Sequence, residues 1–289
     1  MIYVITLNWN RYADTEAFLR SARQSTLPDV RFLVVDNGSS DGSPKKIAAA
    51  FPAVELISNP KNLGFAGGVN VGLRRAQSAG ADYVFLANND TLVAPDMLER
   101  LLKAARAHNA ALVSPAIFYA AEPERIWSAG AWHNPLNLEV TGDRRGQSAS
   151  MLPAEPYTVD FITACGMLIE RTGLETIGLF DERFFMYYED SDYCRRARNA
   201  GLRLLVEPRA HMWHKVSRSS GGSDSPNERY AMASSSVLFF RKHARPWNWP
   251  VIIPYRLASA LRTTVRLARK SRHEALRAYW RGLAAGFRA

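Results

Sequence analysis

The 289-residue sequence predicts an α/β fold built on a mostly parallel, doubly wound sheet. Short apolar runs that suit buried strands alternate with segments of helical period through the first 115 residues. Several of these runs end at clusters of Asn, Asp and Gly, which are typical of the loops at the carboxyl edge of such a sheet. An apolar content of 47% is enough for a substantial core, and the sequence contains no internal repeat.

The first part of the chain is expected to supply most of the parallel sheet. Strands are expected at residues 3–7, 32–35, 54–57, 83–87 and 111–114. Helices are expected at residues 14–25, 45–51, 64–76 and 97–107. Asp14 or Thr15 has a side chain that suits the N-cap of the first of these helices.

The alternation of strands and helices ends after Pro115. Residues 117–150 contain scattered Gly, Pro and Trp without a helical period, so we expect loops and antiparallel pieces there. Further strands are expected at 157–162, 167–169 and 202–206, and further helices at 171–177, 190–200 and 230–243. The Ser- and Gly-rich segment at 217–227 is expected to be a mobile loop.

Composition and charge bound the class of protein. No run approaches the roughly 18 apolar residues of a membrane span, and the first residues suit a strand, so we expect neither a span nor a signal peptide. Two cysteines make no disulfide framework, which favours a reducing, cytoplasmic setting. The net charge of +10 is concentrated in residues 251–289, which hold nine Arg or Lys and one acid. The near-neutral remainder argues against a nucleic-acid binder.

Three short polar side chains, Asn88, Asn89 and Asp90, follow the apolar run at 83–87. Because ligands bind beyond the carboxyl ends of parallel strands, Asp90 is expected where a hard cation and its phosphates are held. Mg²⁺ and Mn²⁺ take oxygen ligands and commonly use only one or two protein carboxylates. The alternative is that this triplet caps the next helix, near Pro95.

Two further segments have the composition of a nucleotide site. Asp36 follows a buried strand, where its carboxylate can accept hydrogen bonds from a base or from ribose hydroxyls, and an Asx turn is the alternative. The segment 64–68, Gly-Phe-Ala-Gly-Gly, lets the backbone approach a phosphate at a helix N-terminus. This segment matches neither G-x-G-x-x-G nor the P-loop, which argues against a nicotinamide dehydrogenase and a P-loop NTPase.

Carboxylates follow an aromatic run at residues 184–188. Aromatic side chains can bind the apolar face of a sugar, and partial desolvation can tune Asp190 for general-base catalysis. The alternative is that these carboxylates favour the start of a helix. Further along the chain, His211 and His214 are candidates to complete a metal site with Asp90, although a lone histidine is more often structural.

Taken together, these motifs resemble the inverting glycosyltransferases of family 2, and the rhamnosyltransferase-like branch in particular. The resemblance rests on residues 34–42, 62–68, 88–90 and 188–192, in that order, and it covers residues 1–242. It implies a GT-A fold, with a Rossmann-like, mostly parallel sheet and an antiparallel part on the acceptor side. A helical C-terminal tail is expected to follow this fold, on the pattern of its own residues. The resemblance also implies a nucleotide-sugar donor, a divalent metal (Mg²⁺ or Mn²⁺) and a glycan or lipid-linked acceptor.

The resemblance further implies roles for individual residues. Asp90 matches the last position of a D-x-D motif in which Asn88 replaces the first Asp, and it is expected to bind metal with His214, or with His211 instead. Asp190 matches the proposed catalytic base. The residues expected to contact the nucleotide-sugar are Asn8, Asp36, Asn37, Gly64, Gly67, Asn70, Asn88 and Asn89. The candidates on the acceptor side are Trp127, Cys165, Gly166, Tyr188 and Glu189.

The implied reaction needs one in-line displacement at the anomeric carbon and no covalent intermediate. Asp190 would remove the acceptor hydroxyl proton, and the metal would neutralise the departing nucleoside diphosphate. The donor is expected to be dTDP-rhamnose or a UDP-sugar, with the 217–227 loop closing over it. The alternatives are a nucleotidyltransferase and a non-enzymatic glycan-binding subunit with the same fold.

The basic tail is expected to form a separate part of the protein. We expect a catalytic domain at 1–245, with a donor half at 1–115 and an acceptor half at 116–245, followed by the tail at 246–289. Apolar and basic residues interleave in the tail, as in a helix that lies on an anionic membrane, here the inner face of the plasma membrane. The alternatives are a helix folded onto the catalytic domain and contact with RNA. Homodimerisation is left open.

Overall fold

The computed structural model describes residues 1–216 and 224–288 of the chain, which forms two compact units. Unit 1 comprises Met1–Trp132, Gly142–Asp181 and Asp190–Val216, and unit 2 comprises His133–Thr141, Glu182–Glu189 and the described part of Ser217–Ala289. Most of the loop expected at 217–227 lies outside the described residues. The functional boundaries expected after residues 115 and 245 stay a prediction.

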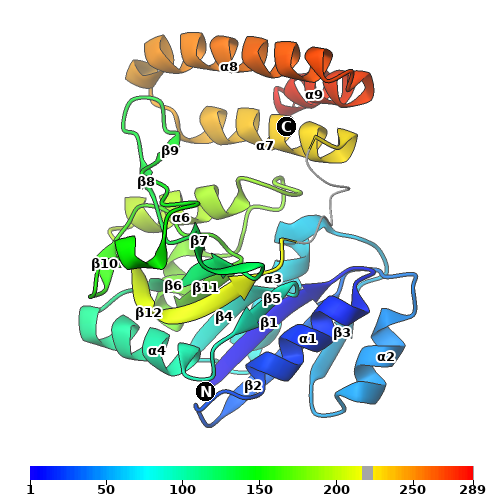
Figure 1. The fold of residues 1–289 in the computed structure, drawn as a ribbon, viewed down its shortest axis with the longest axis vertical. Helices are drawn as coiled ribbons and strands as arrows, with labels where there is room; N and C mark the ends of the chain where they lie inside the picture. Colours follow the sequence, from blue (N-terminus) through cyan, green and yellow to red (C-terminus); the bar gives the residue numbers. More distant parts are fainter. Residues whose placement is uncertain (217–223, 289) are drawn as a thin grey trace. The chain divides into compact units, whose positions relative to one another are not determined.

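One large mixed sheet forms the centre of unit 1 (Figure 1). Its strands are β1 (Ile2–Asn8), β2 (Val30–Asp36), β3 (Glu55–Ser58), β4 (Tyr83–Asn88), β5 (Thr91–Val93), β6 (Leu112–Tyr119), β7 (Glu122–Ser128), β10 (Tyr157–Thr158), β11 (Gly166–Glu170) and β12 (Leu204–His214). They lie in the order β10-β12-β6-β11-β4-β1-β2-β3, with β5 beside β12 and β7 beside β6. Two short strands, β8 (Trp132–His133) and β9 (Val140–Thr141), form a separate ladder.

The predicted sheet is confirmed, including its antiparallel part. Strands β4, β1, β2 and β3 are parallel neighbours, and β6 and β12 also run parallel. The other pairs in the sheet, which involve β5, β7, β10 and β11, are antiparallel. The parallel half therefore comes from the N-terminal part of the chain, where strands and helices alternate.

Helices cover both faces of the sheet, as in a doubly wound fold. Helices α1 (Tyr12–Ala22), α2 (Ser43–Ala50) and α4 (Met97–His108) bury apolar side chains in one core. Helices α3 (Gly64–Ser78), α5 (Arg171–Ile177) and α6 (Glu189–Asn199) bury apolar side chains in the other core. Glu189, the first residue of α6, is counted with unit 2. Along β1, Ile2 and Val4 enter the first core while Tyr3 and Ile5 enter the second. A strand buried on both faces needs this continuous apolar run. A short 3₁₀ helix, η1 (Ala149–Met151), completes the elements of unit 1.

The predicted N-cap of the first helix is wrong. Helix α1 begins at Tyr12, and Arg11 occupies its N-cap position. Neither Asp14 nor Thr15 caps the helix, because both lie within its first turn. The Thr15 hydroxyl instead donates a hydrogen bond to Asn8 at the end of β1.

The strand expected at 157–162 is shorter than predicted and ends at Thr158. The backbone N–H groups of Asp160 and Phe161 both donate to the carbonyl of Ala131. The chain therefore leaves the β10–β12 ladder after two paired residues.

Strand β12 is longer than predicted, and its extra length matters for the site. The expected strand ends at residue 206, whereas β12 continues to His214. Its register against β6 shifts between Glu207 and His211, around Pro208, which has no N–H for the ladder. Beyond this irregularity β12 pairs with β5 and places His214 opposite Thr91.

Unit 2 is mainly helical. Besides β9, it contains α7 (Pro226–His243), the 3₁₀ turn η2 (Pro246–Asn248), α8 (Trp249–Arg269) and α9 (His273–Gly286). The predicted helical tail is confirmed, but it consists of two long helices rather than one. Helix α9 packs closely on α7, since a Cβ at Gly282 or Gly286 would clash with the α7 backbone. Within the described ranges, no helix is both long and apolar enough to cross a bilayer.

Candidate active site

The carboxyl edge of the sheet gathers three of the predicted site residues. Asn8, Asp36 and Asn88 are the last residues of the adjacent strands β1, β2 and β4. The register pairs Asn8 with Asp36, and Leu7 with Asn88. Side chains that lie far apart in the sequence therefore share one edge, where an open α/β sheet binds its ligand.

The turn at Asn89 and Asp90 does not cap a helix. Strand β5 follows directly at Thr91, and α4 begins only at Met97, after Asp96 at its N-cap. The helix-capping alternative for the Asn88–Asp90 triplet is therefore wrong. The turn instead leads from the central strand β4 into a short strand that pairs with β12.

A chain of hydrogen bonds runs along this edge from Asp36 to Asn89. The Asn8 amide donates to Asp36 Oδ1 (2.7 Å) and accepts from the Thr15 hydroxyl (2.8 Å). The Asn89 amide in turn donates to Thr15 Oγ1 (2.9 Å). Ser39 donates to Asp36 from both its backbone N–H (2.9 Å) and its hydroxyl (2.6 Å). Asp36, which is expected to contact the nucleotide base, is thus connected to the Asn89–Asp90 turn, which is expected to bind the metal.

Asp36 and Asn37 are buried, and their side chains are engaged within the protein. Asp36 is 1% exposed. The Asn37 amide donates to the Gly64 carbonyl (2.9 Å) and to Asn62 Oδ1 (3.1 Å), and its oxygen accepts from the Leu63 N–H (3.1 Å). Asn37 therefore holds the loop that precedes α3. Direct contact of either residue with a nucleotide stays a prediction.

The start of α3 needs small residues. Gly64 has a φ of +76°, which favours glycine, and the N-cap residue Leu63 makes no side-chain cap bond. A Cβ at Gly67 would lie 3.0 Å from the Leu63 side chain. The Asn70 amide is held by the backbone of Phe180 at both its oxygen and its nitrogen (2.9 Å each). Asn70 thus stabilises the packing of α3, and its contact with donor stays a prediction.

Asp90 and His214 meet where β12 ends. Nε2 of His214 lies 3.1 Å from Oδ1 of Asp90, and both residues are buried. The ladder fixes this pair, because the Lys215 N–H donates to the Asp90 carbonyl (2.9 Å). The indole of Trp127 contacts the His214 ring edge-on, with centroids 4.3 Å apart. The Arg145 guanidinium lies 5.2 Å from the Trp127 ring centroid and brings a positive charge close to the site.

Of the two candidate histidines, only His214 lies beside Asp90. Side chains alternate along a strand, so His211 points to the opposite face of β12 from His214. The His211 ring contacts Phe118 edge-on at 5.3 Å and lines a separate pocket with Phe118 and Trp213.

The Asp90–His214 pair fits part of a divalent-cation site. A buried carboxylate oxygen and a neutral imidazole nitrogen can both be metal ligands. In the described part of the chain, no group of three or more His, Cys, Asp or Glu side chains is arranged to hold a metal. A cation held by this pair would therefore take its other ligands from phosphate and water, as Mg²⁺ commonly does.

Asp190 lies against the loop that precedes β11. It is half-buried, and desolvation raises its pKa to about 6. Hydrogen bonds from the Ser191 N–H (2.8 Å) and from Thr163 and Ala164 lower the pKa and limit this shift. A carboxylate with a pKa near 6 is mostly ionised at neutral pH and still accepts a proton readily.

The charges of both Asp90 and Asp190 act on the thiol of Cys165. Burial raises the pKa of the Cys165 thiol, and the negative charges of Asp90 and Asp190 raise it further. Both carboxylates therefore lie within electrostatic reach of one thiol. The Cys165 carbonyl accepts from the Asn88 N–H (3.1 Å), which places this thiol at the end of β4.

Most acceptor-side candidates are packed inside the protein. Cys165 is 3% exposed, and Gly166 has no room for a Cβ. In unit 2, the Tyr188 ring lies 5.3 Å from that of Phe239, and burial raises the pKa of its phenol. Glu189 is also buried. Their contact with an acceptor stays a prediction, as does that of Trp127, whose ring contacts His214.

The backbone just before Asp190 is strained. Tyr187 and Tyr188 have φ values of +69° and +66°, which cost residues with a side chain about 1–3 kcal/mol each. Helix α6 begins immediately afterwards, and its Asp192 is fully buried and bonded to Arg196 (2.9 Å). The helix-start alternative is therefore right for the position. Asp190 also lies in the first turn of α6, and it accepts hydrogen bonds from Thr163 and Ala164 outside the helix.

Thr15 and Arg145 are site residues that no sequence motif marks. Thr15 is a residue type that is common at helix N-caps. Only the register of the sheet shows that its hydroxyl forms hydrogen bonds with Asn8 and Asn89. Arg145 lies in a loop between distant strands, where no spacing rule relates it to Trp127.

Comparison with known proteins decides the family. A sequence model described as Glycosyl transferase family 2 matches residues 3–178, which is more than half of the chain. The chain belongs to glycosyl transferase family 2. The predicted glycosyltransferase, in a rhamnosyltransferase-like branch, is confirmed, and family membership argues against the nucleotidyltransferase alternative.

Two relatives of this glycosyltransferase are named as rhamnosyltransferases. The N-acetylglucosaminyl-diphospho-decaprenol L-rhamnosyltransferase of Mycobacterium tuberculosis is 27% identical over 300 residues, covering 95% of this chain and 96% of the relative. The dTDP-rhamnosyl transferase RfbF of Shigella flexneri is 23% identical over 227 residues, covering 74% and 72%.

Solved structures confirm the GT-A fold. A structure of GalNAc-T7 with UDP, GalNAc and Mn²⁺ is similar with a TM-score of 0.62 and 15% identity, covering 86% of this chain and 52% of the other. The mannosyltransferase PcManGT from Pyrobaculum calidifontis, in complex with GDP-Man and Mn²⁺, has a TM-score of 0.58 and 20% identity, covering 100% and 75%. At these identities the likeness concerns the fold alone.

Proposed function

We propose that this glycosyltransferase moves a sugar, with inversion at the anomeric carbon, from a nucleoside diphosphate sugar to a lipid-linked glycan. We favour dTDP-rhamnose as the donor, because the alignments with two rhamnosyltransferases cover 95% and 74% of the chain. The acceptor class follows the name of the mycobacterial relative, which contains a diphospho-decaprenol.

The hydrogen bonds of residues 163–165, which link Asp190 to the end of β4, carry this proposal. Asp190 accepts hydrogen bonds from Thr163 and Ala164, and the carbonyl of the next residue, Cys165, accepts from the Asn88 N–H at the end of the central strand β4 (3.1 Å). Asp90 lies beside His214, next to the hydrogen-bond chain at the carboxyl edge of the sheet. Asp190 is half-buried and has a raised pKa, which suits a general base. One substrate complex can therefore meet a phosphate-binding group and a general base at the same time.

In the proposed reaction Asp190 accepts the proton of the acceptor hydroxyl. The oxygen forms a bond to the anomeric carbon while the bond to the diphosphate oxygen breaks, and that electron pair leaves with the nucleoside diphosphate. Thr163 and Ala164 orient the carboxylate through hydrogen bonds. Because attack and departure occur on opposite sides of the carbon, the configuration inverts without a covalent intermediate.

Asp90 and His214 would hold a divalent cation, Mg²⁺ or Mn²⁺, against the diphosphate. A bound cation supplies positive charge where the leaving group becomes negative. Asn88 is neutral, so Asp90 is the carboxylate that this triplet offers. The presence of Mn²⁺ in two structures of the same fold supports this assignment.

The parts of the chain are assigned accordingly. Residues 1–115 would bind the donor through Asn8, Asp36, Asn37, Gly64, Gly67, Asn70, Asn88 and Asn89. Residues 116–245 would bind the acceptor, and Trp127 among them contacts His214 of the predicted metal pair. We assign the enzyme to the inner face of the plasma membrane, where a lipid-linked acceptor would be available.

Transfer by the purified full-length chain tests this function. The protein is incubated with Mn²⁺, a short-chain lipid-linked diphosphate sugar and, in separate reactions, dTDP-rhamnose, a UDP-sugar and GDP-mannose. The expected product is extended by one rhamnose with inverted anomeric configuration, measured by mass spectrometry and NMR. A product of retained configuration would contradict the proposal. Donor binding without transfer would favour the non-enzymatic glycan-binding alternative.

A further inference from the structure

The outward face of α8 is apolar along its whole length. Its residues recur at helical spacing, and all of them are exposed: Pro250, Pro254, Leu257, Ala258, Leu261, Val265 and Ala268. Leu257 and Leu261 are 66% and 65% exposed. A surface helix normally turns its polar side to solvent, so the orientation of α8 is the reverse of the usual one.

The inner face of α8 is fixed within unit 2 near the start of the helix. Ile252 is buried there. Arg256 donates to the Ser236 hydroxyl of α7 (2.7 Å), and its guanidinium lies 4.9 Å from the Phe240 ring centroid. An arginine that is bonded and stacked in this way resists rotation of the helix about its axis.

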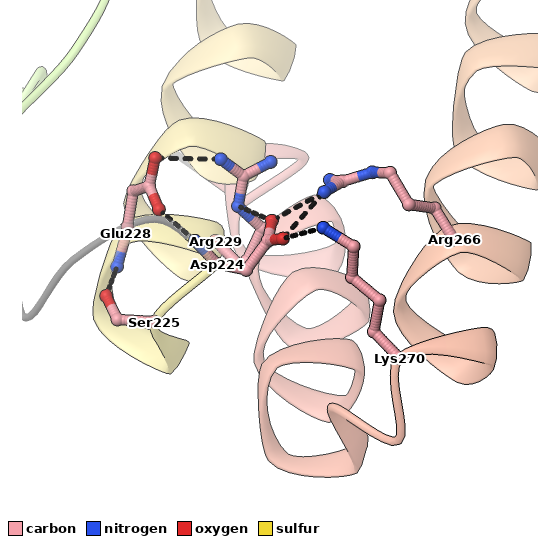
Figure 2. Close-up of polar contacts among 6 residues, drawn as sticks. All are labelled: Asp224, Ser225, Glu228, Arg229, Arg266 and Lys270. Atoms are coloured by element: carbon pink, nitrogen blue, oxygen red, sulfur yellow. Dashed lines mark hydrogen bonds and ion pairs between the residues drawn. The ribbon is translucent and has the colours of Figure 1, made fainter.

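The same face is fixed again near the end of the helix (Figure 2). Arg266 Nη1 donates to both carboxylate oxygens of the buried Asp224 (2.8 and 2.7 Å), which lowers the pKa of Asp224. Arg229 Nε and Lys270 Nζ each lie 3.6 Å from the same carboxylate. Leu267 is fully buried beside this cluster. Because both ends are held, α8 cannot bury its apolar face by turning inward.

Positive charge borders the apolar face. Arg262 and Arg269 are exposed at its edge, and Trp247 is exposed just before the helix. The whole segment 251–289 carries nine basic residues and a single acid. The surface thus combines an apolar strip, a basic edge and an aromatic residue at one end, which suits a membrane interface.

We propose that α8 lies flat on an anionic phospholipid bilayer, with its apolar face in the headgroup boundary and Arg262 and Arg269 against lipid phosphates. This inference rests on the proposed peripheral location and names the surface responsible for it. The helix is about 30 Å long and lies in the interface instead of crossing it. A second copy of the chain is a poorer partner, because pairing two α8 helices would bring like charges together.

Vesicle sedimentation tests the proposal without any sugar donor, so it can fail while the transferase function stands. The full-length protein is mixed with vesicles of phosphatidylcholine alone, or with phosphatidylglycerol added. The wild type is expected to pellet with the anionic vesicles, and the double variant Leu257→Asp/Leu261→Asp is expected to stay in the supernatant. Met151→Asp is the matched control, because Met151 is also an exposed apolar residue (58%) but lies in unit 1. It should pellet like the wild type.

A second variant separates the charge contribution from the apolar one. Arg262→Gln/Arg269→Gln should weaken binding to anionic vesicles about fivefold for each charge removed. Melting curves followed by circular dichroism should match the wild type for both double variants, since the changed side chains are exposed. Pelleting of Leu257→Asp/Leu261→Asp with anionic vesicles would overturn the proposal. So would a wild-type dimer that binds no vesicles and dissociates in this variant.

Discussion

His214 Nε2 lies 3.1 Å from Asp90 Oδ1, although 124 positions of sequence separate the two residues. The pair exists because β12 continues past its bulge and reaches the turn that follows β4. A buried carboxylate and an imidazole held at this distance provide two ligands for a cation.

Replacing His214 should weaken metal-dependent donor binding. His214→Ala and Asp90→Asn each remove one expected ligand, so the donor affinity measured by calorimetry with Mn²⁺ should fall by about tenfold or more. His211→Ala is the matched control, because His211 lies in a different pocket, and its donor affinity should be unchanged. Equal donor affinity of the wild type with and without a chelator would contradict the metal assignment.

The rate of transfer should depend on the ionisation of Asp190. Because the pKa of Asp190 is about 6, the base form predominates above pH 6, and kcat should fall roughly tenfold per pH unit below it. Asp190→Asn should lower kcat by about 100-fold or more while donor binding is kept. A pH–rate profile that is flat between pH 5 and pH 8, or an active Asn variant, would exclude Asp190 as the base.

The same group should affect stability, with a definite sign. Desolvation raises the pKa of Asp190 in the folded state to about 6, so folding favours its protonated form. The ionised form therefore destabilises the fold by at most about 2–3 kcal/mol, a penalty that appears as pH rises from about 4 to above 6. The free energy of unfolding of Asp190→Asn, relative to that of the wild type, should thus be larger at pH 8 than at pH 4. Urea denaturation at the two pH values measures this difference, and an equal difference at both would contradict the shift.

Close packing of α9 on α7 should make Gly282 intolerant of a side chain. Gly282→Val places atoms against the Tyr230 carbonyl and the Ala233 side chain, and overpacking of this kind costs about 1–3 kcal/mol. Ala284→Val on the exposed side of α9 is the matched control and should change the free energy of unfolding little. If both variants unfold at the same urea concentration, the α7–α9 contact is looser than the structure describes.

The sequence predicts the carboxyl edge of the sheet better than the groups that complete the site. Asp36 and Asn88 directly follow continuous apolar runs, and such runs identify both a buried strand and its end. The position of His214 depends on a bulge at Pro208, which interrupts the alternation that identifies strands. The role of Thr15 depends on strand register, which local sequence does not contain.

The sequence of the tail predicts its helical pattern but not which side of the helix faces the protein. Its periodicity predicts an apolar strip beside basic residues. Which side of the helix faces the protein depends on a tertiary contact, the bond between Asp224 and Arg266. The division of the tail into two helices also follows from packing, because α9 closes on α7 through its glycines.

A structure of the Asp190→Asn variant with Mn²⁺ and an intact nucleoside diphosphate sugar would show whether Asp90 and residue 190 act on one bound substrate. The proposed mechanism predicts an anomalous Mn²⁺ signal at Asp90 and His214, with the anomeric carbon of the same bound sugar facing residue 190. A sugar held in a cavity that does not reach residue 190, or a metal bound away from Asp90, would contradict it.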